Sequence, residues 1–416
     1  MEIKRNLYLN RLISLRHSGM VKVITGPRRC GKSYLLFNLF KNYLLAEGVN
    51  PDHIVEVALD EEESEPLLDR HALGQYIRSR LTDNNMHYVL IDEIQEVAGF
   101  ERTLNSLMRL PNTDIYVTGS NSRFLSSEIA TIFRDRGEEI RVHPLSFAEF
   151  MSVQQQPVAS AWDDYLTYGG MPRVLYYQNP DEKAHYLKTL FERTYLTDIM
   201  EKNELRKSTE MGMLLDTLAS ATGSLTNPIR LEHTFRSELG VTFDHETITR
   251  YIGYLENAFL INEAKRFDVK GKKYLTTPLK YYFEDLGLRN ARLNFRQLEE
   301  PHLMENVVYN ELKIRGFNVD VGVVENYRKE QDKTTLVRHE IDFVANRGSN
   351  RCYLQAALNV DDIQKRNQEI RPLLSVRDSF KKIIIIKNDI KPHTDEHGII
   401  TMGLFHFLLD EHSLEG

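Results

Sequence analysis

The sequence predicts an α/β protein that begins with a parallel sheet flanked by helices. In the first 150 residues, short apolar segments typical of buried strands alternate with amphipathic helical patterns, which is the order that builds a parallel sheet. A glycine-rich segment stands directly between the first strand and the first helix. Strands are expected within residues 20–25, 54–58, 87–93, 114–121 and 139–142, and helices after residue 33 and near 72–81 and 100–110.

The bulk composition restricts the class of protein further. At 416 residues, the chain is long enough for several domains. Its net charge of -7 gives no overall basic field, so any contact with nucleic acid must come from a local patch. The cysteines, Cys30 and Cys352, are too few for a disulfide framework and favour a reducing compartment. With no signal-peptide pattern and no long apolar run, we expect a cytoplasmic protein without a membrane span.

The first functional pattern is the glycine-rich segment at residues 26–33. It reads G-x-x-x-x-G-K-S between an apolar strand and a helix expected to end near Gly48, which is the context of a phosphate-binding P-loop. The alternative is a glycine-rich turn with a solvated lysine, but the flanking strand and helix favour the P-loop. We therefore predict that ATP binds at Gly26, Pro27, Arg28, Arg29, Cys30, Gly31, Lys32, Ser33 and Tyr34.

The fixed positions of this motif have distinct chemical roles. Gly26 and Gly31 allow backbone angles that turn successive N–H groups inward as an anion nest. The helix that follows adds the positive end of its dipole beneath the phosphates. Lys32 is expected to reach the β- and γ-phosphate oxygens as a catalytic cation, and Ser33 to bind Mg²⁺.

Two carboxylates follow the apolar strand that begins at residue 87. Asp92 stands at the end of that strand, where it would hold Mg²⁺ together with Ser33. Glu93 is placed to act as the general base on the attacking water. An acidic pair after a strand can also be an ordinary turn, but the P-loop upstream favours the catalytic interpretation.

A further polar group ends the strand within residues 114–121. In a parallel sheet, the C-terminal end of this strand should lie beside that of the Asp92 strand. Thr118, Ser120 or Asn121 could therefore contact the γ-phosphate or position the water. We choose Ser120, and the alternative is that Ser120 caps the next helix.

Several arginines are candidates for contacts with the phosphates. Arg134 and Arg136 precede the last strand of this part, and we predict Arg136 as a finger toward a neighbouring subunit's γ-phosphate in a homo-oligomer. The alternative is a solvated basic turn. Inside the loop, Arg28 and Arg29 either touch phosphate or pair with the acidic residues at 60–62, and the sequence does not decide between these roles.

Several segments, in this order, resemble those of the prokaryotic AAA+-type ATPases of the additional-strand catalytic-glutamate class that carry an uncharacterised C-terminal region. The generic segments are GPRRCGKS and LIDEIQEV, and YVTGSNS and HPLSFAEF follow them. The later, more distinctive segments are YLTYGGMPRVL, FERTYLTDI, TPLKYYFEDLGLRNA, LMENVVYNEL and EIDFVA, so the resemblance covers nearly the whole chain.

This resemblance implies ATP at residues 26–33, Mg²⁺ at Ser33 and Asp92, and Glu93 as the catalytic carboxylate. The sequence departs from the family at two positions. Family members usually have Gly-Arg where this chain has Asp135-Arg136, which weakens the case for a finger, and they often have Trp where Phe100 stands.

The middle of the chain predicts a winged helix, because three helices at 211–221, 227–239 and 244–256 precede a hairpin. Basic side chains that could contact DNA phosphates gather in the stretch from residue 262 to 280: Lys265, Arg266, Lys270, Lys272, Lys273 and Lys280. The third helix is acidic, which argues against base reading in the major groove. Non-specific DNA contact and an internal or protein–protein role therefore both stay open.

The last part resembles the PD-(D/E)xK nuclease fold in the order of its expected elements. That fold holds Mg²⁺ with an acid from a helix, an Asp on one strand and a Glu-x-Lys on the next, and it activates water there. The corresponding residues are Glu305, Asp342 and Gln355, with Ala357 in the place of the lysine. Because Gln brings no charge and Ala no amine, we predict a degenerate site, although Lys365 could return from the next helix. Alternatively, Glu340 and Asp342 are solvated residues of an edge strand.

We therefore expect four parts: an ATPase domain at 1–150, a helical linker or lid at 151–206, a winged helix at 207–295 and a nuclease-like domain at 296–416. The predicted activity is Mg²⁺-dependent ATP binding and hydrolysis that controls the C-terminal half. Two alternatives are an ATP-regulated DNA endonuclease and a non-catalytic nucleotide-dependent scaffold.

Overall fold

A computed structural model describes residues 2–119, 133, 136–205, 208–330, 333–360 and 363–415, with side chains except at 208, 327–330, 333–335 and 363–365. The chain folds into two compact units. One comprises Met1–Pro144 and Asn257–Phe259, and the other comprises Leu145–Glu256 and Leu260–Gly416. This division is coarser than the four predicted parts.

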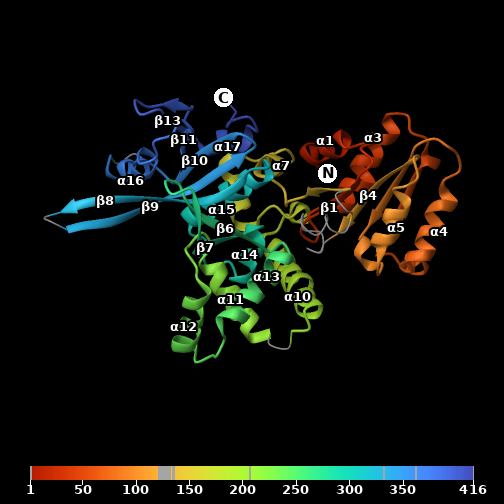
Figure 1. The fold of residues 1–416 in the computed structure, drawn as a ribbon, viewed down its shortest axis with the longest axis horizontal. Coiled ribbons are helices and arrows are strands. Elements are labelled where there is room, and N and C mark those ends of the chain that lie inside the picture. Colours follow the sequence, from red (N-terminus) through yellow and green to blue (C-terminus); the bar gives the residue numbers. More distant parts are fainter. Residues whose placement is uncertain are drawn as a thin grey trace. The chain divides into compact units, whose positions relative to one another are not determined.

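The first unit contains a parallel sheet of five strands, and each predicted strand is present (Figure 1). In the order β2-β3-β4-β1-β5, strand β4 lies between the P-loop strand β1 and the acidic strand β3. The register pairs Thr25 with Gly119 and Ile91 with Val117, so the C-terminal ends of these three strands meet at one edge. The strands are β1 Val21–Thr25, β2 Ile54–Ala58, β3 His87–Asp92, β4 Thr113–Gly119 and β5 Gly137–Arg141.

Alternate residues of each strand face two apolar cores, because side chains alternate across a sheet. Val21 and Val23 of β1 pack with α4 and α5, whereas Ile24 packs with α1 and the helical run after the P-loop. That run consists of α2 Lys32–Tyr34, a π-helical segment η1 Leu35–Phe40 and α3 Lys41–Ala46. The other helical segments are α1 Asn6–Ser14, η2 Pro51–His53, η3 Glu62–Leu68, α4 Arg70–Arg80, η4 Ile94–Glu96 and α5 Phe100–Leu107.

The second unit begins with helices. They are α7 Phe147–Met151, α8 Val158–Tyr168, η6 Pro172–Tyr176, α9 Pro180–Leu190, η7 Phe191–Leu196, α10 Thr197–Lys202, α11 Ser208–Ser220, α12 Pro228–Leu239 and α13 His245–Asn257. Asp244 caps α13 as its position suggested, since the backbone N–H of Thr247 donates to Asp244 Oδ1 over 2.9 Å. The three helices predicted at 211–221, 227–239 and 244–256 are thus present as α11, α12 and α13.

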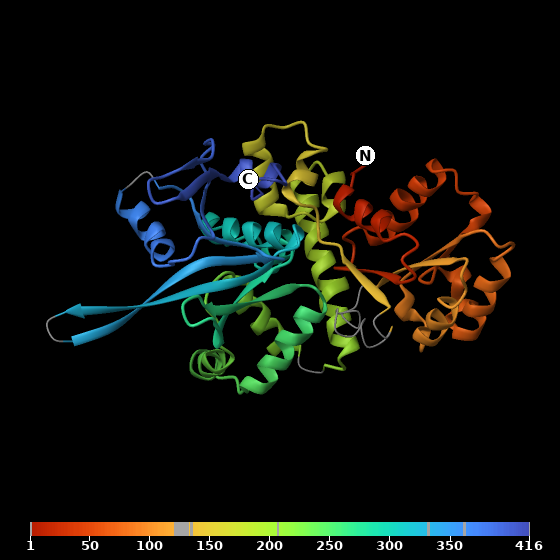
Figure 2. The same ribbon diagram turned by 45° about the horizontal axis from the view of Figure 1, so that its top comes forward.

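An eight-stranded mixed sheet forms the rest of this unit, in the order β12-β13-β11-β10-β9-β8-β6-β7. The antiparallel pair β8–β9 is the longest, and it extends beyond the other strands (Figures 1 and 2). The strands are β6 Ile261–Asp268, β7 Lys273–Phe283, β8 Asn318–Glu330, β9 Lys333–Arg347, β10 Asn350–Ala357, β11 Lys381–Ile386, β12 His393–Thr394 and β13 Ile399–Gly403. The helices within this part are α14 Leu286–Arg292, α15 Glu300–Ile314, α16 Ile363–Leu374 and α17 Leu404–Leu409.

The hairpin expected to be a wing is β6–β7, and it belongs to this sheet. Its strand β6 pairs in parallel with β8, with Arg266 opposite Val321. The predicted boundary at residue 295 therefore separates strands that are hydrogen-bonded in one sheet. In contrast, α15, β8, β9, β10, α16 and β11 follow one another in the predicted order. Among the described residues, the structure has no helix that could span a membrane.

Candidate functional site

The glycine-rich loop between β1 and α2 has the backbone of an anion nest. Gly26, Arg29 and Gly31 have φ angles of 140°, 65° and 101°, which lie in the region that favours glycine. At Gly26 a second restriction applies, because a Cβ atom there would lie 2.0 Å from the carbonyl oxygen of Val142. Only glycine fits this position, and the loop approaches the end of β5 closely as a result.

Lys32 begins the helical run and is only 4% exposed. Its Nζ donates to the carbonyl oxygens of Gly26 and Pro27, over 3.1 and 2.9 Å. The ammonium group therefore lies at the mouth of the same loop whose N–H groups form the nest. This arrangement places positive charge where a bound anion would meet both the nest and the helix N-terminus.

Arg5, which no sequence pattern singled out, anchors this loop through two hydrogen bonds. Its Nη1 donates to the carbonyl oxygen of Cys30 over 3.0 Å, and its Nη2 donates to that of His143 over 2.6 Å. The side chain is 3% exposed. The Cys30 thiol is also buried and lies 3.6 Å from the carbonyl oxygen of Val142, so Cys30 packs against the sheet. The partners are far apart in sequence, so no local pattern could reveal this anchor.

Asp92 ends β3 beside the loop, as predicted, and is 3% exposed. Its carboxylate accepts a hydrogen bond from the hydroxyl group of Thr118, and the hydroxyl group of Ser33 also lies near it. Burial raises the pKa of Asp92, and these two hydroxyl groups oppose that rise. The structure thus brings together the two predicted metal ligands, Ser33 and Asp92, and Thr118 on the neighbouring strand supports them.

Glu93 lies one residue further along, with a φ angle of 52° in the left-handed region. Its backbone N–H donates to Thr118 Oγ1 over 3.0 Å, so one hydroxyl contacts both acidic residues. Its Oε2 accepts a hydrogen bond from the amide of Gln95. Thr118 was one of three residues considered for the sensor role, and it is the one that the structure places against Asp92.

The remaining predicted residues of this site are not seen beside the loop. Ser120, Asn121 and Arg134 lie outside the described residues, so their roles stay predictions. Arg136 is exposed and precedes β5, and its carbonyl oxygen accepts a hydrogen bond of 2.8 Å from the N–H of Val21, the first residue of β1. Arg136 therefore lies at the edge of the sheet opposite the P-loop, which excludes contact with a nucleotide in its own loop. Its predicted reach to a neighbouring subunit is untested.

The donor set of this site fits a magnesium-bound triphosphate. A serine hydroxyl and a carboxylate are hard oxygen ligands of the kind that Mg²⁺ prefers. The nest and Lys32 supply positive charge for the phosphates, and Glu93 stands next to Asp92, the predicted metal ligand. These residues come from the ends of adjacent parallel strands and from the loop, as in the crevice where open α/β sheets bind ligands.

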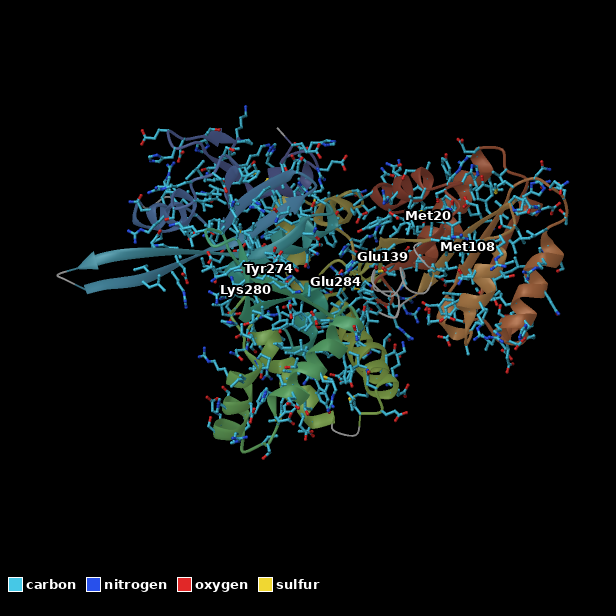
Figure 3. All side chains as sticks on the ribbon, viewed as in Figure 1. Met20, Met108, Glu139, Tyr274, Lys280 and Glu284 are labelled. Atoms are coloured by element: carbon cyan, nitrogen blue, oxygen red, sulfur yellow. The ribbon has the colours of Figure 1, made fainter. Side chains whose placement is uncertain are left out.

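A second group of polar residues lies in the sheet of the other unit, where the three predicted nuclease-like residues come together around a lysine. Lys280 of β7 donates to Glu305 Oε1 of α15 over 2.9 Å and to Glu340 Oε1 of β9 over 2.8 Å. The hydroxyl of Tyr282 donates to the same Glu305 oxygen over 2.7 Å. Lys280 is 4% exposed, and Figure 3 labels it on β7.

Asp342 and Gln355 complete this group. Gln355 Oε1 accepts from the N–H of Asp342 over 2.7 Å, and its Nε2 donates to Glu369 Oε2 over 2.8 Å. The N–H of Ala356 donates to Asp342 Oδ2 over 2.9 Å. Burial and the charge of Glu305 raise the pKa of Asp342 well above its ordinary value. The side chain of Lys365, considered as a replacement lysine, is outside the described residues.

Burial and the neighbouring carboxylates have opposite effects on the pKa of Lys280. Burial alone would lower the pKa of Lys280, but the carboxylates of Glu305, Asp342 and Glu340 outweigh it and raise that pKa above its ordinary value. Lys280 is therefore a permanent ammonium within an acidic group. The sequence placed it with the basic hairpin, because exposure of alternate strand residues is not visible in composition.

The hairpin itself is less basic on its surface than its sequence suggested. Arg266 is only 9% exposed, because it lies within β6 where side chains alternate between the two faces of the sheet. Lys270 donates to the carbonyl oxygen of Glu325 over 3.1 Å. Lys265, Lys272 and Lys273 are exposed. The predicted patch for DNA phosphates therefore does not include Arg266, whose side chain is buried.

Comparison with known proteins gives a family assignment. Residues 18–151 match the family model of an AAA domain, and residues 159–299 match a domain of unknown function. An uncharacterized protein of Haemophilus influenzae is 35% identical over 389 residues, which cover 92% of this chain and 93% of that protein. The uncharacterized protein MJ1544 of Methanocaldococcus jannaschii is 25% identical, over 88% of this chain and 81% of that protein.

Among solved structures, the Walker-type ATPase paby2304 of Pyrococcus abyssi matches with a TM-score of 0.49 and 16% identity, over 70% of this chain and 96% of that chain. The sequence match to the Haemophilus influenzae protein spans nearly the full length of both chains. The chain therefore belongs to the same family as that protein, and its first part is an AAA-type P-loop domain.

Proposed function

We propose that this protein binds ATP with Mg²⁺ in the loop at residues 26–33 and hydrolyses it to ADP and phosphate. The observation that carries this proposal is that Ser33 of the loop and the buried carboxylate of Asp92 lie close together, near enough for the Ser33 hydroxyl to lower the pKa of Asp92. The two residues are distant in sequence, and they converge beside a nest whose φ angles suit anion binding. A structural turn would not require a buried carboxylate at this position.

The roles of the chain's own residues follow from their positions. Lys32 neutralises the β- and γ-phosphate oxygens, while the N–H groups of the loop hold them in place. Mg²⁺ supplies a Lewis acid that lowers the charge on the phosphates when it is bound. Thr118 fixes the carboxylate of Asp92 through its hydroxyl, and it fixes the backbone of Glu93 by accepting the N–H.

Glu93 takes the proton from the attacking water as the water oxygen bonds to the γ-phosphorus. The bond between that phosphorus and the β–γ bridging oxygen breaks, and ADP leaves. Gln95 contributes indirectly, because its amide donates to Glu93 Oε2 and limits the orientations of that carboxylate.

The test of this proposal is phosphate release by purified protein with ATP and Mg²⁺. We expect Glu93→Gln to lower the rate by about 100-fold or more with ATP affinity retained, since it removes a general base. Lys32→Ala should weaken ATP binding itself. Glu96→Gln is a matched control, because Glu96 lies in the same turn but is exposed. Equal rates for wild type and Glu93→Gln would refute hydrolysis by this site.

We further propose that the nucleotide state controls the second unit. The supporting observation is that one unit contains the P-loop, Asp92 and Glu93, whereas the other unit lacks the Glu-x-Lys of a nuclease. Phosphate release measured with and without double-stranded DNA tests whether DNA is the partner. Stimulation by DNA that is lost when Lys265, Lys272 and Lys273 are replaced by alanine would assign the exposed hairpin lysines to DNA binding.

A further inference from the structure

We propose that Lys280 takes the place that a divalent cation holds in a nuclease with these elements, so that the C-terminal acidic group already contains a cation of the chain and binds no metal. The inference is independent of the ATP site. It concerns the group formed by Lys280, Glu305, Glu340, Asp342, Gln355 and Glu369, which we call the lysine-centred group.

The position of the ammonium is the first argument. A metal in the nuclease fold lies between the acid of the helix and the acids of the strands. Lys280 Nζ lies between the same elements, 2.9 Å from Glu305 Oε1 on α15 and 2.8 Å from Glu340 Oε1 on β9. The side chain reaches this point from β7, a strand of the hairpin that precedes α15 (Figure 3). The side chain of Lys280 is only 4% exposed, so these carboxylates are its partners in place of solvent.

The second argument is that three of the oxygen atoms that would bind a metal already accept hydrogen bonds within the chain. Gln355 Oε1 accepts from the N–H of Asp342, at 2.7 Å. Asp342 Oδ2 accepts from the N–H of Ala356, at 2.9 Å, and Glu305 Oε1 accepts from the hydroxyl of Tyr282, at 2.7 Å. A hard cation needs several oxygen ligands at once. Here it would have to displace these hydrogen bonds and also approach an ammonium group.

Charge balance is the third argument, and it explains two departures in the sequence together. Replacing the expected Glu by Gln355 removes one negative charge from the three ligand positions. An ammonium group supplies one positive charge fewer than a divalent cation. At these three positions the two changes compensate, because buried charges must be paired to be tolerated. Glu340, which is 33% exposed, and Glu369 belong to the group but not to these three positions. The missing lysine at Ala357 fits the same interpretation, since a site without metal-activated water has no use for a second cation.

The consequence is a unit that keeps the fold and the acidic group of a nuclease without its chemistry. With no metal, no water is activated at Asp342 and no phosphodiester bond is cut. Lys280 instead joins β7, α15 and β9 through charge-assisted hydrogen bonds, which are among the stronger contacts available to a protein. It is therefore a structural cation that fixes the hairpin to the sheet.

The experiment measures Mn²⁺ binding to the full chain without nucleotide, by electron paramagnetic resonance and by the shift of the unfolding temperature. Asp92→Asn is present in every sample, so that the P-loop site does not contribute. The parent should bind no Mn²⁺ in the lysine-centred group at millimolar concentration. Lys280→Met removes the ammonium and should gain a site, with an unfolding temperature raised by about 3 °C or more by Mn²⁺.

Two further variants make the result decisive. Lys183→Met is the matched control, because Lys183 also forms an ion pair in this unit, 3.2 Å from Asp164, but with a single carboxylate. It should gain no Mn²⁺ site. If Lys280→Met fails to fold, the double variant with Glu340→Gln relieves the carboxylate repulsion and leaves Glu305 and Asp342 to bind the ion.

Plasmid nicking with Mg²⁺ or Mn²⁺ provides the second measurement, and the parent should show none. The proposal is overturned if the parent binds Mn²⁺ and loses that binding in Asp342→Asn. It is also overturned if nicking occurs and is lost in Lys280→Met, because Lys280 would then be a catalytic lysine beside a metal. A folded variant without Lys280 that gains no Mn²⁺ site would equally contradict it.

Discussion

Replacing Gly26 by alanine tests the geometry on which the ATP site depends. The added Cβ atom would lie 2.0 Å from the carbonyl oxygen of Val142, whereas real Cβ contacts are essentially never under 3.0 Å. The loop or the end of β5 must therefore move by at least about 1 Å. Neither is free to do so, because Val142 N–H donates to the carbonyl oxygen of Thr25 over 2.8 Å and Arg5 holds Cys30 from behind.

The expected magnitude combines two costs. A non-glycine residue at a φ angle of 140° costs on the order of 1–3 kcal/mol, and the overpacked contact adds about as much again. Gly19→Ala separates them, because Gly19 also has a positive φ angle, 72°, but no atom within 4 Å of the added Cβ. We expect that control to cost only about 1 kcal/mol.

The assays are calorimetric unfolding and titration with a fluorescent ATP analogue. Gly26→Ala should lower the unfolding temperature clearly more than Gly19→Ala does. It should also weaken ATP binding by at least about tenfold, which corresponds to about 1.4 kcal/mol of lost preorganisation in the nest. If the two variants unfold alike and both bind ATP as wild type does, the close approach of the loop to Val142 is refuted.

Three further predictions concern buried polar groups. Asp114→Asn should lower the free energy of unfolding by about 3–5 kcal/mol, because it leaves the ammonium of Lys22, which is 0% exposed, without its ion partner. In a double-mutant cycle, adding Lys22→Met should recover much of that loss. Thr118→Val should reduce phosphate release by at least about tenfold with ATP affinity nearly unchanged, since the hydroxyl contacts both Asp92 and Glu93. An equal loss of affinity would contradict this role. Burial raises the pKa of Asp285 to about 6, so the folded state holds its proton more tightly than the unfolded state. The contribution of this proton to the free energy of unfolding is complete below about pH 3.8 and is lost as the pH rises through 6. The loss is on the order of 3 kcal/mol. The unfolding temperature of wild type should fall over this pH range, and that of Asp285→Asn should lack this fall.

Much of the first unit could be predicted because its signals are local. The strands are apolar runs, the loop is a contiguous motif, and Asp92 and Glu93 follow a strand directly. What the sequence could not supply is the identity of distant partners. Arg5 lies 138 positions from His143, yet the two residues share a hydrogen bond, and nothing in the composition near Arg5 indicates it.

The second unit shows the same limit more sharply. Its helices and strands were predicted in the right order, but the hairpin was assigned to a separate wing because strand pairing is invisible in a single sequence. Lys280 and Arg266 were then counted as surface cations of that wing. Both are buried, because successive side chains of a strand point to opposite faces of the sheet, and these two point into the interior.

The two acidic groups of this protein differ in a way that decides what each can hold. At the ATP site, the partners of Asp92 are the neutral hydroxyl groups of Thr118 and Ser33, so the negative charge of the carboxylate is left uncompensated by them. In the lysine-centred group, Glu305 has an ammonium partner at 2.9 Å. A carboxylate held by hydroxyl groups still attracts a divalent cation, whereas one already paired with a buried lysine has lost most of that attraction. Binding of a divalent cation should therefore occur in the first unit, and replacing Lys280 should be the change that adds such a site to the second.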